Sequence, residues 1–240
     1  MQNLWWNLRQ AVVFALVVFV CLVAGYAFYD LWQVEQSASM NNADFKLAQG
    51  GDSDDIKWQE SENMIAWIRI DDTNIHHPIM HGRDNKWYLT HDWQEQYSTA
   101  GSVFLDYRND ANFHDDYIVI YGHRMSRGLM FSDIGNFADE KYFNEHESGV
   151  IFVPSGEFKL ETVAFLRPRI DSVLYDVEGR IKLEARDNLE DVLDFADLVN
   201  YEAIDKVRSG REGKLIVLST CSRDSNKTRD ALVMFAVRVK

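Results

Sequence analysis

The stretch Lys-Leu-Ile-Val-Leu-Ser-Thr-Cys, residues 214–221, decides the fold. It is a short apolar run rich in branched residues, which predicts a buried strand. The run ends at Cys221, and the only other cysteine, Cys21, lies in a long apolar segment near the N-terminus. Cys221 therefore has neither a disulfide partner nor a second thiolate for a metal site. A thiol at a strand end, followed by polar residues, is placed to react. The alternative is a small buried hydrophobic side chain, as free cysteines often are.

Similar runs recur from residue 64 onward, while helical periodicity is sparse. Short helices are predicted within 84–93 and 124–147, and the clearest helical face spans 188–199, with Asn188 or Asp187 as its N-cap. Pro78 lies within the apolar run 75–80 and predicts that this run is an edge strand or that a strand starts there. The predicted strands are 64–70, 75–80, 101–106, 117–122, 150–153, 158–166, 214–220 and 231–239. This count, with few helices, favours a closed or nearly closed eight-stranded β-barrel over a doubly wound sheet.

Residues 11–29 carry no charge and are long enough to cross a bilayer as a helix. Arg9 precedes this segment and Asp30 follows it, so the positive-inside rule places the N-terminus in the cytoplasm. The run is longer than the apolar part of an ordinary signal peptide, and no clear cleavage site follows closely. We therefore predict an uncleaved, single-pass signal anchor.

These patterns divide the chain into three parts. Residues 1–30 form a cytoplasmic tip and a transmembrane anchor, 31–63 form a linker with one or two short N-terminal helices, and 64–240 form the barrel domain. The net charge of −13 argues against a nucleic-acid-binding protein, because no basic patch is visible. An acidic cluster within 52–55 lacks the glycine and glutamate spacing of a calcium loop.

A reactive thiolate needs a base or a cation beside it and a donor for the oxyanion. Among seven histidines, His123 directly follows an apolar strand that should be central in the sheet. His76, His77 and His81 have metal-like spacing, but no carboxylate or cysteine framework accompanies them. The remaining histidines also lie in turns or polar stretches: His91, His114 and His146.

Arg229 leads into the last predicted strand, eight residues after Cys221. If the last two strands pair as a hairpin, the loop between them brings Arg229 back beside the cysteine. Arg223 is nearer in sequence but lies within that loop, so it ranks second as the oxyanion donor. The alternative for Arg229 is a surface arginine beside Asp230.

The elements Leu218-Ser219-Thr220-Cys221, Arg229 and Ile120-Tyr121-Gly122-His123 resemble those of sortases, the membrane-anchored cysteine transpeptidases of Gram-positive bacteria. The resemblance runs from about residue 64 to 239. Val217 stands where the family signature has a threonine, and Ser222 and Arg223 stand where class B relatives often have an acidic residue. The similarity to class B lies in further motifs: Asp84-Asn85, Tyr88-Leu89, the run 101–106 and Arg108-Asn109.

The resemblance implies that Cys221 attacks the threonine carbonyl of a C-terminal sorting signal on a secreted protein. Arg229 would stabilise the oxyanion, and His123 would protonate the leaving amine. The thioacyl intermediate would then pass to a peptidoglycan cross-bridge amine or a pilin lysine. The resemblance implies no cofactor and no metal, and an extracellular catalytic domain on the cell membrane.

By similarity to class B, the groove for the signal is lined by Leu89, Tyr175, Ser219 and Ser222. Core packing is the alternative for Leu89. Two other functions stay open for the chain. One is an exported cysteine peptidase that hydrolyses peptides with the same Cys–His pair, and the other is a non-catalytic surface barrel with a buried cysteine.

Overall fold

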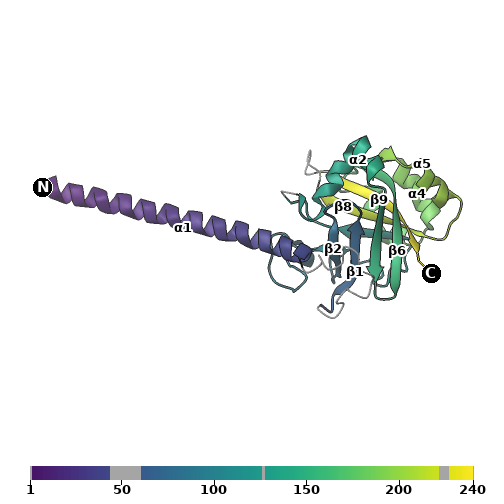
Figure 1. Ribbon diagram of the computed structural model, residues 1–240, viewed down its shortest axis with the longest axis horizontal. Helices are drawn as coiled ribbons and strands as arrows, with labels where there is room; N and C mark the ends of the chain where they lie inside the picture. Colours follow the sequence, from purple (N-terminus) through teal and green to yellow (C-terminus); the bar gives the residue numbers. More distant parts are fainter. Residues whose placement is uncertain (1, 44–60, 126–127, 222–226, 240) are drawn as a thin grey trace.

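The computed structural model describes residues 2–43, 61–125, 128–221 and 227–239. A long helix, α1 (Gln2–Ala43), projects away from a β-barrel that carries the C-terminal end of the chain (Figure 1). Its segment Arg9–Trp32 is long and apolar enough to cross a membrane, and none of it is buried against the rest of the protein. Residues 31–43, part of the predicted N-terminal helices, continue α1, and residues 44–60 lie outside the described residues.

Eight strands close the barrel, as the sequence predicts. Each is hydrogen-bonded to the next in the ring, and pairing of its first and last members completes the closure. A ninth strand, β7 (Ala196–Val199), pairs with β6 (Gly156–Leu166) outside the ring. The ring order is β5 (Ser148–Val153), β1 (Met64–Ile70), β2 (His76–His81), β3 (Val103–Leu105), β4 (Tyr117–Tyr121), β8 (Lys214–Cys221), β9 (Arg229–Arg238) and β6 (Gly156–Leu166).

Short helices fill the connections between strands. Two of them, α4 (Ala185–Leu193) and α5 (Tyr201–Arg208), lie side by side against the outside of the barrel (Figure 1). The helical elements are η4 (Trp87–Leu89), η6 (Phe131–Ala138), α2 (Glu140–Glu145), η7 (Val173–Tyr175), α3 (Val177–Arg180), α4 (Ala185–Leu193) and α5 (Tyr201–Arg208).

Strand β8 is buried on both faces, which explains its unbroken apolar sequence. Ile216 and Leu218 belong to the core inside the barrel. Leu215 and Val217, on the opposite face, pack in a second core with residues of α4 and α5. The strand that carries Cys221 is therefore held between two hydrophobic layers.

The predicted edge position of the strand that contains Pro78 is wrong. Strand β2 lies between β1 and β3 and is paired with both. The proline is tolerated because pairing with β3 starts only at Ile79, so the missing N–H of Pro78 interrupts no hydrogen bond on that side.

The predicted helix over 188–199 begins and ends earlier in the structure. Helix α4 has Glu184 as its N-cap residue, and Asn188 is fully buried within it, bonded to Arg180 and to the preceding loop. The last apolar positions of the predicted helix instead form β7, which pairs with Ala164–Leu166 of β6. On this edge of β6, strand β5 pairs only with residues 156–161, so the rest of the edge is free to pair with β7. This strand pairing overrides the helical periodicity of the sequence.

His77 predicts a pH-dependent stability. Its ring is buried in β2, with Nε2 3.3 Å from the Met130 carbonyl oxygen, and burial lowers its pKa from 6.5 to about 4. The folded state keeps this imidazole neutral while the unfolded chain binds a proton below pH 6.5. His77 therefore makes its full contribution to the free energy of unfolding above pH 6.5, and about 3 kcal/mol of this contribution is lost as the pH falls to 4.

Replacing His77 with glutamine keeps a polar donor but removes the titration. Urea unfolding of the full chain in detergent, at pH values from 7 to 4, should show a shallower loss of stability in His77→Gln than in the wild type. His114→Gln is the matched control, because His114 is largely exposed. Identical pH slopes for the wild type and His77→Gln would contradict this assignment.

Candidate active site

Three neighbouring strands end at one edge of the barrel, and each brings one predicted catalytic residue there. Strands β4 and β8 are parallel, with Tyr121 opposite Ser219. His123 and Cys221 each lie two residues beyond that pair, so both lie at the same edge of the sheet. Strands β8 and β9 pair antiparallel, with Cys221 opposite Arg229. The predicted hairpin is confirmed, although the side chain of Cys221 lies outside the described part of the structure.

A cleft of 370 Å³ opens at this edge. It contains five of the seven predicted site residues, whereas two larger hollows, of 1040 and 590 Å³, contain none of them. A lining of aromatic and aliphatic side chains with a few polar groups suits a peptide-sized ligand. The lining residues are Asn85, Leu89, Phe104, Tyr121, Gly122, His123, Ile170, Tyr175, Ser219, Thr220 and Arg229. Ser222 lies outside the described residues, as does Arg223.

The imidazole of His123 is oriented by a backbone carbonyl. Its Nε2 lies 2.8 Å from the carbonyl oxygen of Leu89. A carbonyl can only accept, so Nε2 carries the proton in this arrangement and donates it. The backbone is fixed as well, because the His123 carbonyl accepts from the Phe131 amide at 3.0 Å and the Gly122 amide donates to Ser219 at 3.1 Å.

Glycine is required at position 122 by close packing. A Cβ there would lie 2.7 Å from the Phe131 ring, closer than carbon atoms approach. The small residue lets the chain turn out of β4 over that ring, which delivers His123 to the edge beside Leu89.

The helical turn η4, which supplies the Leu89 carbonyl, is itself anchored by Glu95. The two carboxylate oxygens accept from Trp87 Nε1 and from the Tyr88 hydroxyl, each at 2.5 Å. Gly101, with φ of +59°, packs against this turn, and a Cβ there would overlap the carbonyl oxygens of Tyr88 and Leu89. The position of His123 thus depends on a loop more than 30 residues away in sequence.

The predicted groove residues Leu89, Tyr175 and Ser219 meet in the cleft. The hydroxyl of Tyr175 lies 2.9 Å from Ser219 Oγ and joins η7 to β8. The side chain of Leu89 is 37% exposed and lines the cleft, so core packing does not describe it.

Arg229 is half-buried at the edge of the cleft. Its amide donates to the Pro168 carbonyl at 2.9 Å, in addition to the strand pairing with β8. The next residue, Asp230, is buried and forms an ion pair at 3.4 Å with Arg124, the neighbour of His123. The start of β9 is therefore fixed on both sides, and it is tied to the segment that carries the histidine.

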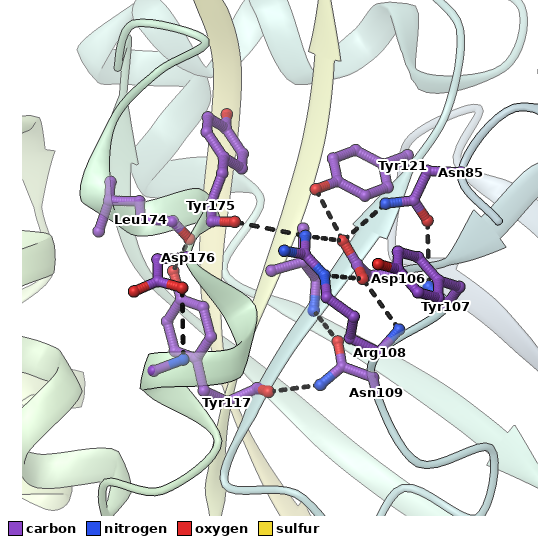
Figure 2. A network of polar contacts seen from close by, with 12 residues as sticks. Asn85, Asp106, Tyr107, Arg108, Asn109, Tyr117, Tyr121, Leu174, Tyr175 and Asp176 are labelled. Atoms are coloured by element: carbon purple, nitrogen blue, oxygen red, sulfur yellow. Dashed lines mark hydrogen bonds and ion pairs between the residues drawn. The ribbon is translucent and has the colours of Figure 1, made fainter.

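A network of polar side chains lies behind the cleft, centred on Asp106 and Arg108 (Figure 2). It bonds Asn85 and Tyr121, which line the cleft but were not predicted as site residues. Both stand in the motifs that carry the family resemblance, so a signal for them was present. Ile170, another lining residue, lies in a segment with no recognisable pattern.

Metal-like histidine spacing does not produce a metal site in the part of the chain that the structure describes. No three histidine, cysteine or acidic side chains gather there. His76 and His77 are consecutive residues of β2, so their side chains point to opposite faces of the sheet.

Known proteins similar to this chain are sortases. Sortase B of Listeria monocytogenes is 28% identical over 176 residues, which cover 72% of this chain and 69% of that protein. A class B sortase of Streptococcus pyogenes involved in pilus biogenesis has a TM-score of 0.66 and 26% identity, covering 75% of this chain and 95% of that chain. No protein-family profile matches the sequence.

The same fold occurs in a Staphylococcus aureus sortase B–substrate complex, with a TM-score of 0.65 at 17% identity, over 89% of this chain and 99% of that one. Together with the closed barrel, these comparisons show that the chain is similar to sortases, and most similar to those of class B.

Proposed function

We propose that this enzyme cleaves a C-terminal sorting signal of secreted proteins after threonine and transfers the acyl group to an amine through a thioester on Cys221. The observation that carries the proposal is the strand register at the edge of the cleft. It sets the backbones of Cys221 and Arg229 opposite one another and ends the parallel His123 strand beside them.

In the first step, the Cys221 thiolate attacks the threonine carbonyl carbon, and the negative charge moves to the carbonyl oxygen. The Arg229 guanidinium supplies planar donors for this oxyanion. Collapse of the intermediate breaks the C–N bond, and His123 gives its proton to the departing amine. A second amine then attacks the thioester, forms a new amide bond and releases the thiol.

The acceptor is a peptidoglycan cross-bridge amine or a pilin lysine, and the reaction needs no cofactor. The S. pyogenes relative is involved in pilus biogenesis, which supports a pilin acceptor as one of the two. The apolar segment of α1 serves as a single-pass membrane anchor with the N-terminus in the cytoplasm, which places the barrel outside the cell.

Replacing the proposed nucleophile or proton donor tests the reaction. Cys221→Ala should abolish turnover, because Cys21 lies in the apolar helix and cannot substitute. His123→Ala should lose about 10²-fold or more, the usual contribution of a positioned proton donor. The measurement is mass spectrometry of products from Asn-Pro-x-Thr and Leu-Pro-x-Thr peptides, with candidate amines added or omitted.

The products also separate transfer from hydrolysis. A new amide with the added amine indicates a transpeptidase, whereas release of the free acid alone indicates an exported cysteine peptidase that uses the same pair. Near-normal turnover in Cys221→Ala or His123→Ala would overturn the proposed roles.

A second prediction separates the two arginines of the β8–β9 hairpin. Arg229→Lys should lose about 10²-fold or more in acyl-enzyme formation, because lysine keeps the charge without the planar donor geometry. Arg223→Lys is the matched control and should be nearly silent. The rate of acyl-enzyme formation with one sorting peptide compares the two, and a crippled Arg223→Lys beside a healthy Arg229→Lys would reverse the assignment.

If the apolar segment of α1 is only a membrane anchor, it should not be needed for peptide turnover. Deletion of residues 1–30 should leave a soluble, active protein, because residues 9–32 contribute no buried surface to the barrel. Circular dichroism and peptide turnover measure the result. Aggregation, or loss of the β signature, would show that the boundary is misplaced.

A further inference from the structure

The carboxylate of Asp106 is wholly buried directly after β3, behind the cleft rather than in it. An isolated carboxylate in such a place is strongly unfavourable. Here Arg108 donates from Nε at 2.8 Å and from Nη2 at 2.7 Å, and its amide donates at 3.0 Å. Asn85 Nδ2 at 2.9 Å and the Tyr121 hydroxyl at 3.1 Å complete the set (Figure 2). The charge is therefore fully paired and hydrogen-bonded.

Two of these donors belong to residues that line the cleft. Asn85 is held from both sides, because its Oδ1 also accepts from the Tyr107 amide at 3.0 Å. The Tyr121 hydroxyl points toward Asp106, and the centre of its ring lies 6.3 Å from that of the Tyr175 ring (Figure 2). Asp106 thereby holds one wall of the cleft, formed by Asn85 and Tyr121.

Tyr175 of η7 lines a second wall of the cleft, and Arg108 links this wall to Asp106. Its Nη2, already bound to Asp106, also donates to the Tyr175 carbonyl at 3.3 Å. The two preceding carbonyls in η7 accept from side chains as well, Val173 from Arg180 at 2.8 Å and Leu174 from Tyr117 at 3.0 Å. Of these three side-chain bonds, the one at Tyr175 lies at the cleft, where the Tyr175 hydroxyl meets Ser219.

The charges agree with this geometry. Burial acts to raise the pKa of Asp106, but the bonds from Arg108 and Asn85 outweigh it, and the pKa lies below its ordinary value. Burial and the nearby Asp106 charge raise the pKa of Tyr121, so its hydroxyl stays protonated and donates. An ionised carboxylate thus holds every donor in a fixed direction.

We propose that Asp106 is a positioning residue for sorting-signal binding: through Tyr121, Asn85 and Arg108 it holds the two walls of the cleft at the separation that the peptide requires. The proposal rests on the proposed function, since it assigns the cleft to the peptide. Asp106 touches neither the peptide nor the reacting atoms. Its loss should therefore weaken peptide binding and leave the chemical step largely intact.

Asp106→Asn is the direct test, because it keeps the shape of the side chain. One oxygen becomes an NH₂ group that faces a donor, and Arg108 loses its counter-ion. We expect KM for a sorting peptide to rise about 10-fold or more, with kcat lowered less than about 3-fold. The alkylation rate of Cys221 by iodoacetamide should stay within about 2-fold of wild type, since that reaction needs no cleft.

Hydrogen exchange provides a readout that needs no substrate. Amides of residues 170–176 should exchange faster in Asp106→Asn than in the wild type, because the Tyr175 carbonyl loses its ordered donor. Asp115→Asn is the matched control. Its carboxylate also accepts two hydrogen bonds, from Asn109 and from the Asp110 amide, but Asp115 is not among the residues that line the cleft.

Arg108→Lys provides a second test of the proposal if Asp106→Asn does not fold. Lysine keeps the positive charge but cannot reach both the carboxylate and the Tyr175 carbonyl, so the same changes should appear with smaller size. Unchanged KM and unchanged exchange in either folded variant would overturn the positioning role. A wild-type enzyme that acts on no sorting peptide would instead refute the proposed function, and the exchange comparison would still decide whether Asp106 orders the cleft.

Discussion

The parallel pairing of β4 with β8 is the constraint on which the rest of the site depends. Two parallel neighbours end at the same edge of a sheet, so residues at or just after the ends of both strands reach the same place. The pairing of Tyr121 with Ser219 fixes the register, and a slip by one residue would turn every side chain to the opposite face. Burial of both faces of β8 makes such a slip costly. Packing in the core therefore sets the geometry at the edge.

Much of this arrangement can be predicted from the sequence, because strong local patterns coincide with the tertiary structure. The runs that became β4 and β8 each contain at least four consecutive apolar residues, as expected of strands buried on both faces. The hairpin that returns Arg229 to Cys221 follows from two adjacent strands and a short polar loop. The predictions fail where pairing partners decide the outcome. Pro78 fits an interior strand only because β3 starts pairing after it, and the end of a helical pattern became β7 because an edge of β6 was uncovered.

The polar network behind the cleft marks a different limit. Asp106 and Arg108 stand two residues apart, which by itself describes a common surface ion pair. Their structural role depends on groups that the fold brings close from distant parts of the sequence, since Tyr175 lies 67 residues beyond Arg108. The motif that contains Asp106 carried the family resemblance, yet no local pattern gives its partners. Long-range side-chain contacts of this kind become visible only in three dimensions.

Two kinds of restraint thus act on the site at different levels. The proposed catalytic residues are positioned by the backbone: Cys221 and Arg229 by their shared register, and His123 by the carbonyl of Leu89. The cleft walls are set by side chains that converge on one buried carboxylate. Backbone restraints survive most substitutions, whereas a side-chain network changes with each residue in it. Under the proposed function, this division separates the side chains that shape the cleft for the peptide from the backbone that positions the reacting groups.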